Sequence, residues 1–119
     1  MHFIVFDMEF NQDFSSLQNT KEKWPKYPFE IIQIGALKLD SDFNRIASFN
    51  RFVKPTFYEK VSSFITELTN ITTEQLIEEQ TFPEVYKCFI DFMGDCDSVF
   101  CVWGMSDIRE LFKMWNIII

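Results

Sequence analysis

Segments with a β-strand pattern come first along this chain, and segments with a helix pattern follow them. Runs rich in β-branched and aromatic residues cover Phe3–Glu9, Glu30–Leu39 and Arg45–Pro55. A polar stretch, Asn11–Pro28, separates the first two runs and reads as a loop, and Ser41–Asn44 has the composition of a turn. Short turns favour antiparallel pairing, so we expect the three strands to form an antiparallel meander.

Two short helices are predicted after the third strand. Ser62 and Ser63 are N-cap candidates for the first, and Thr72 or Thr73 can cap the second, which continues through Glu79. Hydroxyl side chains at these positions accept hydrogen bonds from the free N–H groups of a first helical turn.

The clearest amphipathic pattern covers Phe82–Met93, where aromatic and aliphatic residues recur at helical spacing. Gly94 is expected to end this helix. A short strand over Ser98–Trp103, which we expect to be buried, comes next. A last helix begins at Ser106 or Asp107 and is predicted to direct three side chains inward: Leu111, Phe112 and Trp115.

The order of three strands, helices, a strand and a helix indicates an α/β fold with a mixed sheet flanked by helices. A right-handed crossover would place the strand Ser98–Trp103 parallel to the first strand and beside it. The length of 119 residues suits one core, so we expect residues 1–119 to form a single domain.

Composition excludes several classes of protein. The net charge of −7 argues against broad electrostatic capture of nucleic acid, although a local site built around cations stays possible. The three cysteines, Cys88, Cys96 and Cys101, lack CxxC spacing and predict reduced thiols rather than a zinc site or disulfides. Without a signal-peptide pattern or an apolar stretch of about 20 residues, we expect a soluble cytoplasmic protein with no membrane partner.

Asp7 and Glu9 are the two acids of the otherwise apolar run "FIVFDMEF". Residues two apart in a strand point to the same side, about 6.5 to 7 Å from each other. Two carboxylates that close repel each other unless a cation lies between them, and oxygen ligands favour Mg²⁺ or Mn²⁺ over zinc. The alternative is that both acids mark the solvated end of the strand.

Asp107 is a third candidate acid, in the opening turn of the last helix. An acid there is also explained by its favourable interaction with the helix dipole. If the fourth strand lies beside the first, however, Asp107 could project toward Asp7 and Glu9. The three carboxylates would then surround one metal pocket.

Five segments in this order, "FDMEF", "EIIQIGAL", "FVKP", "ITELTNIT" and "VWGMSD", resemble the DEDDh branch of the DEDD 3′-5′ exonucleases, and the resemblance spans Ile4 to Leu111. Its nearest group includes histone-mRNA and small-RNA trimming exonucleases and sporulation-inhibitor homologues. The resemblance implies a ribonuclease H-like fold. It also implies two-metal hydrolysis, with Mg²⁺ or Mn²⁺, at the 3′ end of single-stranded nucleic acid, with RNA favoured over DNA.

The resemblance also assigns residues. The catalytic and metal-binding acids would be Asp7, Glu9 and Asp107. The residues that contact the substrate would be Met8, Phe10, Leu68 and Thr69. Asn70 takes the place of a usual glycine, which is a mild departure because asparagine tolerates a left-handed backbone. Glu30, where relatives often have a glutamate, is expected to have only a supporting role.

The family's third motif, a histidine followed by an aspartate, is not found after Asp107. The only histidine is His2, and Ile117–Ile119 resembles the opening of a fifth strand. We therefore expect a C-terminally incomplete domain that is weakly active or inactive, with self-association through its exposed C-terminal edge. The alternative is a non-catalytic remnant that acts as a nucleic-acid-binding or protein-binding module.

Overall fold

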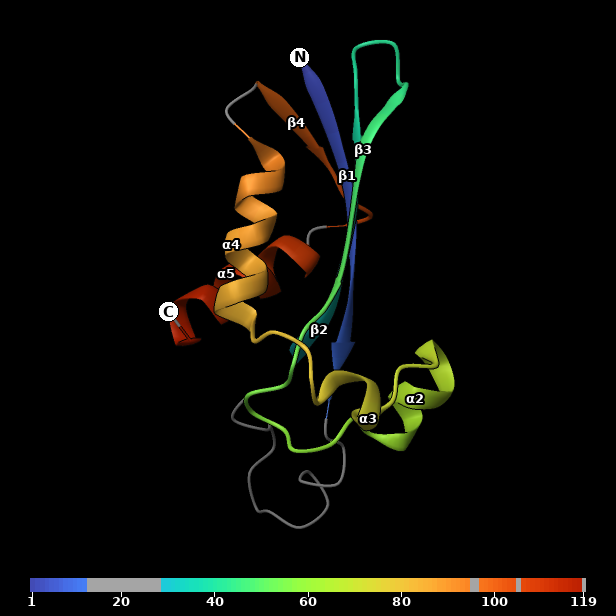
Figure 1. The fold of residues 1–119 in the computed structure, drawn as a ribbon, viewed down its shortest axis with the longest axis vertical. Helices are drawn as coiled ribbons and strands as arrows, with labels where there is room; N and C mark the ends of the chain where they lie inside the picture. Colours follow the sequence, from blue (N-terminus) through green and yellow to red (C-terminus); the bar gives the residue numbers. More distant parts are fainter. Residues whose placement is uncertain (13–28, 95–96, 105, 119) are drawn as a thin grey trace.

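A four-stranded mixed sheet forms the centre of the fold (Figure 1). The computed structural model describes residues 1–12, 29–94, 97–104 and 106–118. Three strands form the predicted antiparallel meander: β1 (His2–Asn11), β2 (Glu30–Leu39) and β3 (Arg45–Phe52). The fourth strand, β4 (Ser98–Cys101), pairs parallel to β1, so the order is β3-β2-β1-β4. The predicted mixed α/β sheet is confirmed.

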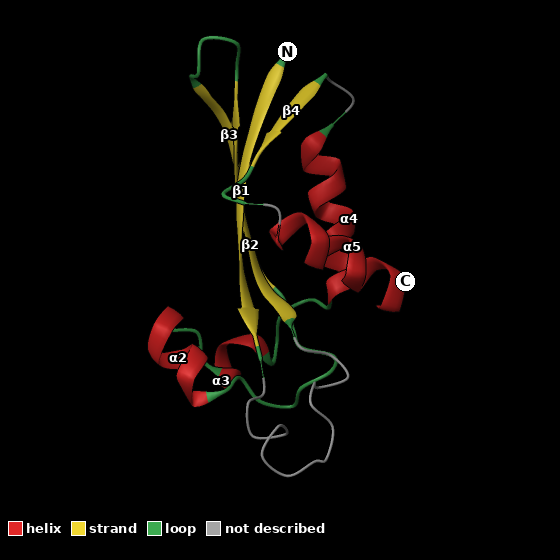
Figure 2. Cartoon of the chain, turned by 180° about the vertical axis from the view of Figure 1, so that it is seen from behind, coloured by secondary structure: helices red, strands yellow, loops and turns green. Residues whose placement is uncertain are grey.

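Helices lie on both sides of this sheet (Figure 2). The helices α4 (Phe82–Met93) and α5 (Ser106–Ile118) pack on one side. The short helices α2 (Ser63–Thr69) and α3 (Thr73–Leu76) lie at the far end of β1, where this strand pairs only with β2. In the described part of the chain, no helix combines the length and the apolar character needed to cross a bilayer.

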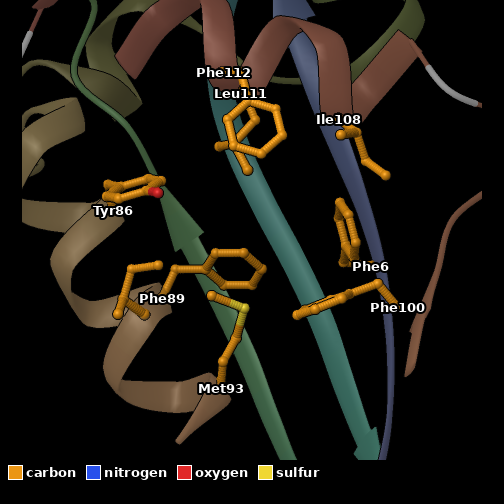
Figure 3. A pocket seen from close by; sticks show the side chains of 9 residues that line it. Phe6, Tyr86, Phe89, Met93, Phe100, Ile108, Leu111 and Phe112 are labelled. Carbon is orange, nitrogen blue, oxygen red and sulfur yellow. The ribbon is translucent and has the colours of Figure 1, made fainter. Parts of the chain in front are cut away.

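The main core lies between the sheet and α4 and α5. Alternation along β1 buries Ile4, Phe6 and Met8 on this side and leaves Val5 and Asp7 exposed on the other. From α4, Phe89 meets the Phe6 ring edge-on, with 5.9 Å between ring centroids. A cavity of about 310 Å³ remains beside this pair, lined by aromatic and aliphatic side chains from α4, α5 and the strands (Figure 3).

A second, smaller cluster lies under α2 and α3 and contains Ile32, Val61, Ile65, Ile71 and Leu76. The β1–β2 register shifts between Glu9 and Phe10, and the neighbours Ile31 and Ile32 join different clusters. A bulge of this kind changes which face a strand residue points to. It places Ile31 in the same core as Ile34, three positions along β2, while Ile32 faces the α2–α3 segment.

Several element boundaries differ from the sequence prediction. Asn11 belongs to β1 rather than to the predicted loop, of which residues 13–28 lie outside the described part. The third strand stops at Phe52, before Pro55, and the second short helix stops at Leu76. The capping predictions hold, because the Ser62 hydroxyl accepts from Ile65 N–H and Thr72 forms a capping box with Gln75.

The predictions for the C-terminal region were partly wrong. The strand β4 is not buried, since Val99 is 41% exposed and Phe100 is 49% exposed at the end of the sheet. Ile117 and Ile118 continue α5 instead of opening a strand, because no glycine or proline ends the helix before them.

The inward direction of the α5 side chains was predicted correctly only in part. Leu111 is buried as expected, but Phe112 is 57% exposed. Helical rotation of about 100° per residue turns Phe112 away from the side that carries Asp107, Leu111 and Met114. The Trp115 side chain lies outside the described residues.

Candidate functional site

Asp7 and Glu9 lie on the face of the sheet opposite α4 and α5. Asp7 is exposed, and Glu9 is half-buried nearer to α2. On the neighbouring strand β2, Asp7 pairs with Gly35 and Glu9 pairs with Gln33. Because Gly35 has no side chain, the backbone beside Asp7 is open to a ligand.

Asp107 joins Asp7 at the free edge of β1. The strand β4 pairs with β1 only as far as Val5, so the edge of β1 beyond that point is open to the start of α5. The Asp107 side chain is 8% exposed and shares a hydrogen bond with the Asp7 carboxyl. The Met8 N–H donates to Asp7 Oδ1 at 3.0 Å and also interacts with the Asp107 carboxylate.

This arrangement concentrates negative charge. Burial, followed by the Asp7 charge and the hydrogen bond that protonated Asp107 donates to Asp7, raises the pKa of Asp107 to about 6, although the Met8 N–H opposes that change. Burial, followed by the Asp7 charge, also raises the pKa of Glu9. The carboxyl oxygens and their mutual repulsion suit a hard divalent cation such as Mg²⁺ or Mn²⁺.

The three acids do not yet converge on one point. Asp7 and Asp107 form a close pair, whereas Glu9 influences Asp107 only through its charge. Among the described residues, no group of three or more histidine, cysteine, aspartate or glutamate side chains is arranged to hold a metal ion. The donor chemistry of the pair therefore fits a cation, and Glu9 would have to move toward it to join.

A cavity of about 240 Å³ lies next to Glu9, between the end of β1 and α2. Eight residues line it: Glu9, Phe10, Gln12, Phe29, Phe64, Ile65, Leu68 and Thr69. Three of the four residues that the resemblance assigns to substrate, Phe10, Leu68 and Thr69, share this cavity. The fourth, Met8, is only 4% exposed and its side chain packs in the main core, so only its backbone faces the acids.

Two aromatic side chains enlarge the apolar wall of this cavity. The Phe10 and Phe29 rings meet edge-to-face, with centroids 6.1 Å apart. Leu68 is 70% exposed at the cavity rim, on the last turn of α2. Asn70 ends α2 with φ 63°, the left-handed conformation expected where relatives have glycine. The open apolar wall of this cavity lies beside the Glu9 carboxylate. It suits a ligand that has both a flat apolar ring and a charged group.

Asn11 fixes the position of α2 relative to β1. Its side chain is fully buried, its Nδ2 donates to the Lys60 carbonyl at 3.1 Å, and its Oδ1 accepts from the Ser62 N–H at 3.0 Å. Both partners directly precede α2. Sequence reasoning missed this role because an asparagine after a strand usually reads as the start of a loop.

Glu30 has a similar role at the other strand. Its buried carboxylate accepts three backbone hydrogen bonds, from Thr56 at 2.6 Å, Phe57 at 2.9 Å and Tyr58 at 3.2 Å. Burial raises the pKa of Glu30, and the three N–H donors oppose that change. The resemblance assigned Glu30 only a supporting role, and a glutamate at the start of an otherwise apolar strand is a further signal of it.

A family model described as exonuclease (RNase_T) matches residues 4–113. The chain belongs to this exonuclease family. The match spans both β1, with Asp7 and Glu9, and the start of α5, with Asp107. It confirms the resemblance to DEDDh-type 3′-5′ exonucleases predicted from the sequence.

Two curated relatives share parts of this exonuclease sequence. Human 3′-5′ exoribonuclease 1 is 34% identical over 70 residues, which are 58% of this chain and 20% of the relative. The PolC-type DNA polymerase III of Clostridium perfringens is 38% identical over 93 residues, 78% of this chain and 6% of the relative. The chain thus spans a fifth or less of the length of these relatives.

Solved structures share the fold. The nuclease domain of 3′hExo, described as a DEDDh family member bound to rAMP, superposes with a TM-score of 0.79 at 22% identity, over 98% of this chain and 58% of that one. E. coli exonuclease I bound to a dT13 oligonucleotide gives a TM-score of 0.65 at 14% identity, over 87% of this chain and 20% of that one. The ribonuclease H-like fold is therefore confirmed.

Proposed function

We propose that this chain acts in 3′-5′ exonuclease chemistry, on the terminal phosphodiester of single-stranded nucleic acid. The observation that carries the proposal is the contact between Asp7 and Asp107, two residues along β1 from Glu9, which lines the cavity with Phe10, Leu68 and Thr69. RNA is favoured over DNA because one curated relative is named an exoribonuclease and one similar structure holds rAMP. Membership of the exonuclease family supports the reaction class.

The residues of the site have distinct roles in this proposal. Asp7, Asp107 and Glu9 would hold two Mg²⁺ or Mn²⁺ ions, which would polarise the phosphoryl oxygens and lower the pKa of the attacking water. The Met8 N–H orients the Asp7 carboxylate. Phe10 offers an apolar face to the terminal base.

Two further residues complete the binding of the terminal nucleotide. Leu68 and Thr69 close the α2 side of the same cavity. Asn11 keeps α2 at the distance from β1 that this cavity requires, through its bonds to Lys60 and Ser62. Binding of the 3′ end is therefore assigned to two elements, β1 and α2.

Proton transfer is the step of the reaction for which this site offers the fewest candidate residues. The only histidine in the sequence is His2, which opens β1 and pairs with Ser98. Asp7 comes five positions after His2 along the strand, roughly 16 Å away at about 3.3 Å per residue. General-base catalysis is typically worth about 10²- to 10⁴-fold, so we expect this chain alone to bind 3′ ends and hydrolyse them weakly or not at all.

The second candidate function, a non-catalytic nucleic-acid-binding or protein-binding module, rests on that same position of His2. A 5′-labelled single-stranded RNA, incubated with the chain and Mn²⁺ and resolved on a gel, separates the two. Shortening from the 3′ end that Asp7→Asn abolishes would support catalysis. Binding without any shortening would favour the module.

Metal binding tests the site itself. Titration calorimetry with Mn²⁺ should show weak binding that Asp7→Asn reduces and that Asp97→Asn, at an exposed acid outside the site, leaves unchanged. Equal loss in both variants, or no binding by the parent, would remove the metal assignment.

The proposal also includes self-association and a cytoplasmic location. The strand β4 is an edge strand of the sheet, where a second copy could add a strand, and its side chains Val99 and Phe100 are both partly exposed. The two described cysteines, Cys88 and Cys101, are free thiols, in keeping with a reducing compartment. Light scattering should show association that increases with concentration, and a monomer at every concentration would contradict it.

A further inference from the structure

Trp103 is the most exposed large hydrophobic side chain among the described residues, at 97%. It follows β4 and precedes Gly104, whose φ of +85° places it in the left-handed region. Tryptophan is highly buried on average, because its ring carries more apolar surface than that of other residues. An almost fully exposed tryptophan ring is therefore a candidate for contact with a ligand.

The position of Trp103 points to the site already described. In Figures 1 and 2 the loop between β4 and α5 turns onto the face of the sheet opposite α4 and α5. This is also the face that carries Asp7. Trp103 lies four positions before Asp107, whose carboxyl contacts Asp7. Trp103 thus lies two residues after the end of β4 and shortly before the helix that carries Asp107.

The order of features along β1 places the acids between the cavity and Trp103. The strand β4 ends opposite Val5, and the loop with Trp103 begins there. Asp7 comes next, and Glu9 and Phe10 border the cavity proposed for the terminal nucleotide. A strand whose last nucleotide fills that cavity and whose scissile phosphate meets Asp7 would extend its preceding nucleotides toward Val5 and Trp103.

The net charge of the chain is an independent reason to expect that bases are bound by stacking. Proteins that hold single strands combine basic grooves with aromatic side chains on which bases stack. With a net charge of −7, this chain has little capacity to neutralise phosphates. Base stacking needs no positive charge and tolerates every sequence, since each base has a π face.

We infer that Trp103 stacks on a base of the substrate strand, upstream of the terminal nucleotide. This inference rests on the proposed function, and it adds a second binding point to the cavity lined by Phe10 and Leu68. The contact holds the strand across the acids without reading its sequence. Trp103 is therefore a substrate-binding residue with no part in the chemical step.

The test measures binding of a fluorescent oligouridylate whose last linkage is a phosphorothioate, in the presence of Mn²⁺. Trp103→Ala should weaken binding about 5- to 100-fold, Trp103→Leu should weaken it similarly, and Trp103→Phe should retain most of the affinity. Phe43→Ala, at another exposed aromatic residue in the β2–β3 turn, is the matched control and should change nothing. Circular dichroism should show that all variants fold.

A second probe with abasic sites upstream of the terminal nucleotide identifies stacking. The parent and Trp103→Ala should bind this probe equally. If Trp103→Ala binds the intact probe as well as the parent does, the inference is wrong while the proposed function stands. Full affinity in Trp103→Leu, or an equal loss on the abasic probe, would also overturn stacking. If the parent binds no oligonucleotide, the proposed function itself fails.

Discussion

The side of the sheet that packs on α4 and α5 and the end that carries α2 and α3 are held by different kinds of contact. Phe6, Phe89 and Leu111 represent the first, where aromatic and aliphatic side chains surround a cavity (Figure 3). The second also has a small apolar cluster, but it is distinguished by Asn11 and Glu30, whose buried polar groups bind backbone atoms of the segment before α2.

The difference shows that one set of contacts stabilises the sheet and another sets the position of the cavity between β1 and α2. Apolar burial is non-directional, so it stabilises the sheet without fixing any one atom. Hydrogen bonds to buried groups are directional, and leaving one unmade costs about 1–3 kcal/mol. The cavity between β1 and α2 is therefore placed by hydrogen bonds, while the opposite side supplies most of the stability.

Phe89→Ala should reduce the free energy of unfolding more than the other variants do, because it removes apolar contacts from the side of the sheet that packs on α4 and α5. The ring is buried and contacts the Phe6 and Phe49 rings, with centroid distances of 5.9 and 5.4 Å. Removing a buried phenylalanine typically costs about 3–5 kcal/mol of unfolding free energy. Phe112→Ala, at the exposed rim of the same cavity, is the control and should cost less than about 1 kcal/mol. Urea unfolding of both variants that gave equal losses would contradict this comparison.

Glu30→Gln should have the next largest effect, on the polar end. One carboxylate oxygen becomes an NH₂ group that faces backbone donors, so we expect a loss of about 1–3 kcal/mol. Glu59→Gln, at an exposed glutamate in the same segment, should be neutral. Thermal unfolding measures both. Amide hydrogen exchange should also become faster at residues 56–58 in Glu30→Gln, and unchanged exchange would mean that Glu30 does not fix this segment.

The sequence was informative where periodicity or capping decides the structure. The helix Phe82–Met93, the N-caps Ser62 and Thr72, and the parallel pairing of β4 with β1 all follow from local pattern or connection handedness. An edge position is not local information. The exposure of β4 was therefore missed, whereas the continuation of α5 through Ile118 was missed because its apolar end also suits a strand.

The candidate site also has some features that the sequence predicts and others that only the folded chain shows. The contact between Asp7 and Asp107 was expected from the strand order, and their roles stay predictions. The cavity behind Leu68 depends on the buried bonds of Asn11 to residues 49 and 51 positions away. No sequence pattern reports contacts across such a separation, so the role of Asn11 became visible only in the folded chain.

In metal-free protein, Asp107→Asn should have a smaller effect on the free energy of unfolding than the two variants above, and it should stabilise the protein rather than destabilise it. The folded-state pKa of about 6 lies above the ordinary value of 3.8, so the folded state binds more protons between these values. Stability should therefore fall as pH rises from about 4 to about 6, and stay low above that. The asparagine keeps a donor for Asp7 and removes the charge, so the variant should be more stable at pH 7.

We expect this gain to be on the order of 1 kcal/mol, because solvent screens a site near the surface. Thermal unfolding from pH 4 to pH 7 should give a flatter profile for Asp107→Asn than for the parent. Asp97→Asn, at an exposed acid, should follow the parent. Added Mn²⁺ should stabilise the parent and not Asp107→Asn, as expected for a ligand that binds only the folded site. A parent less stable at pH 4 than at pH 6, with the difference lost in Asp107→Asn, would contradict the charge clustering.

Asn70→Gly should change the free energy of unfolding least, and it tests whether Asn70 positions the C-terminal end of α2. Asn70 has φ 63° and ψ 13°, and its N–H donates to the Thr66 carbonyl at 2.8 Å to end the helix. Glycine adopts this conformation without steric cost but loses more entropy on folding, so we expect a change within about 0.5 kcal/mol. Asn70→Ala keeps the entropy of an ordinary residue and adds the left-handed penalty, so it should destabilise by about 1 kcal/mol. Because Asn11 rather than the helix end fixes α2 on β1, oligonucleotide affinity should be unchanged in Asn70→Gly. A loss of affinity with unchanged stability would mean that the C-terminus of α2, and Leu68 with it, is positioned by Asn70 itself.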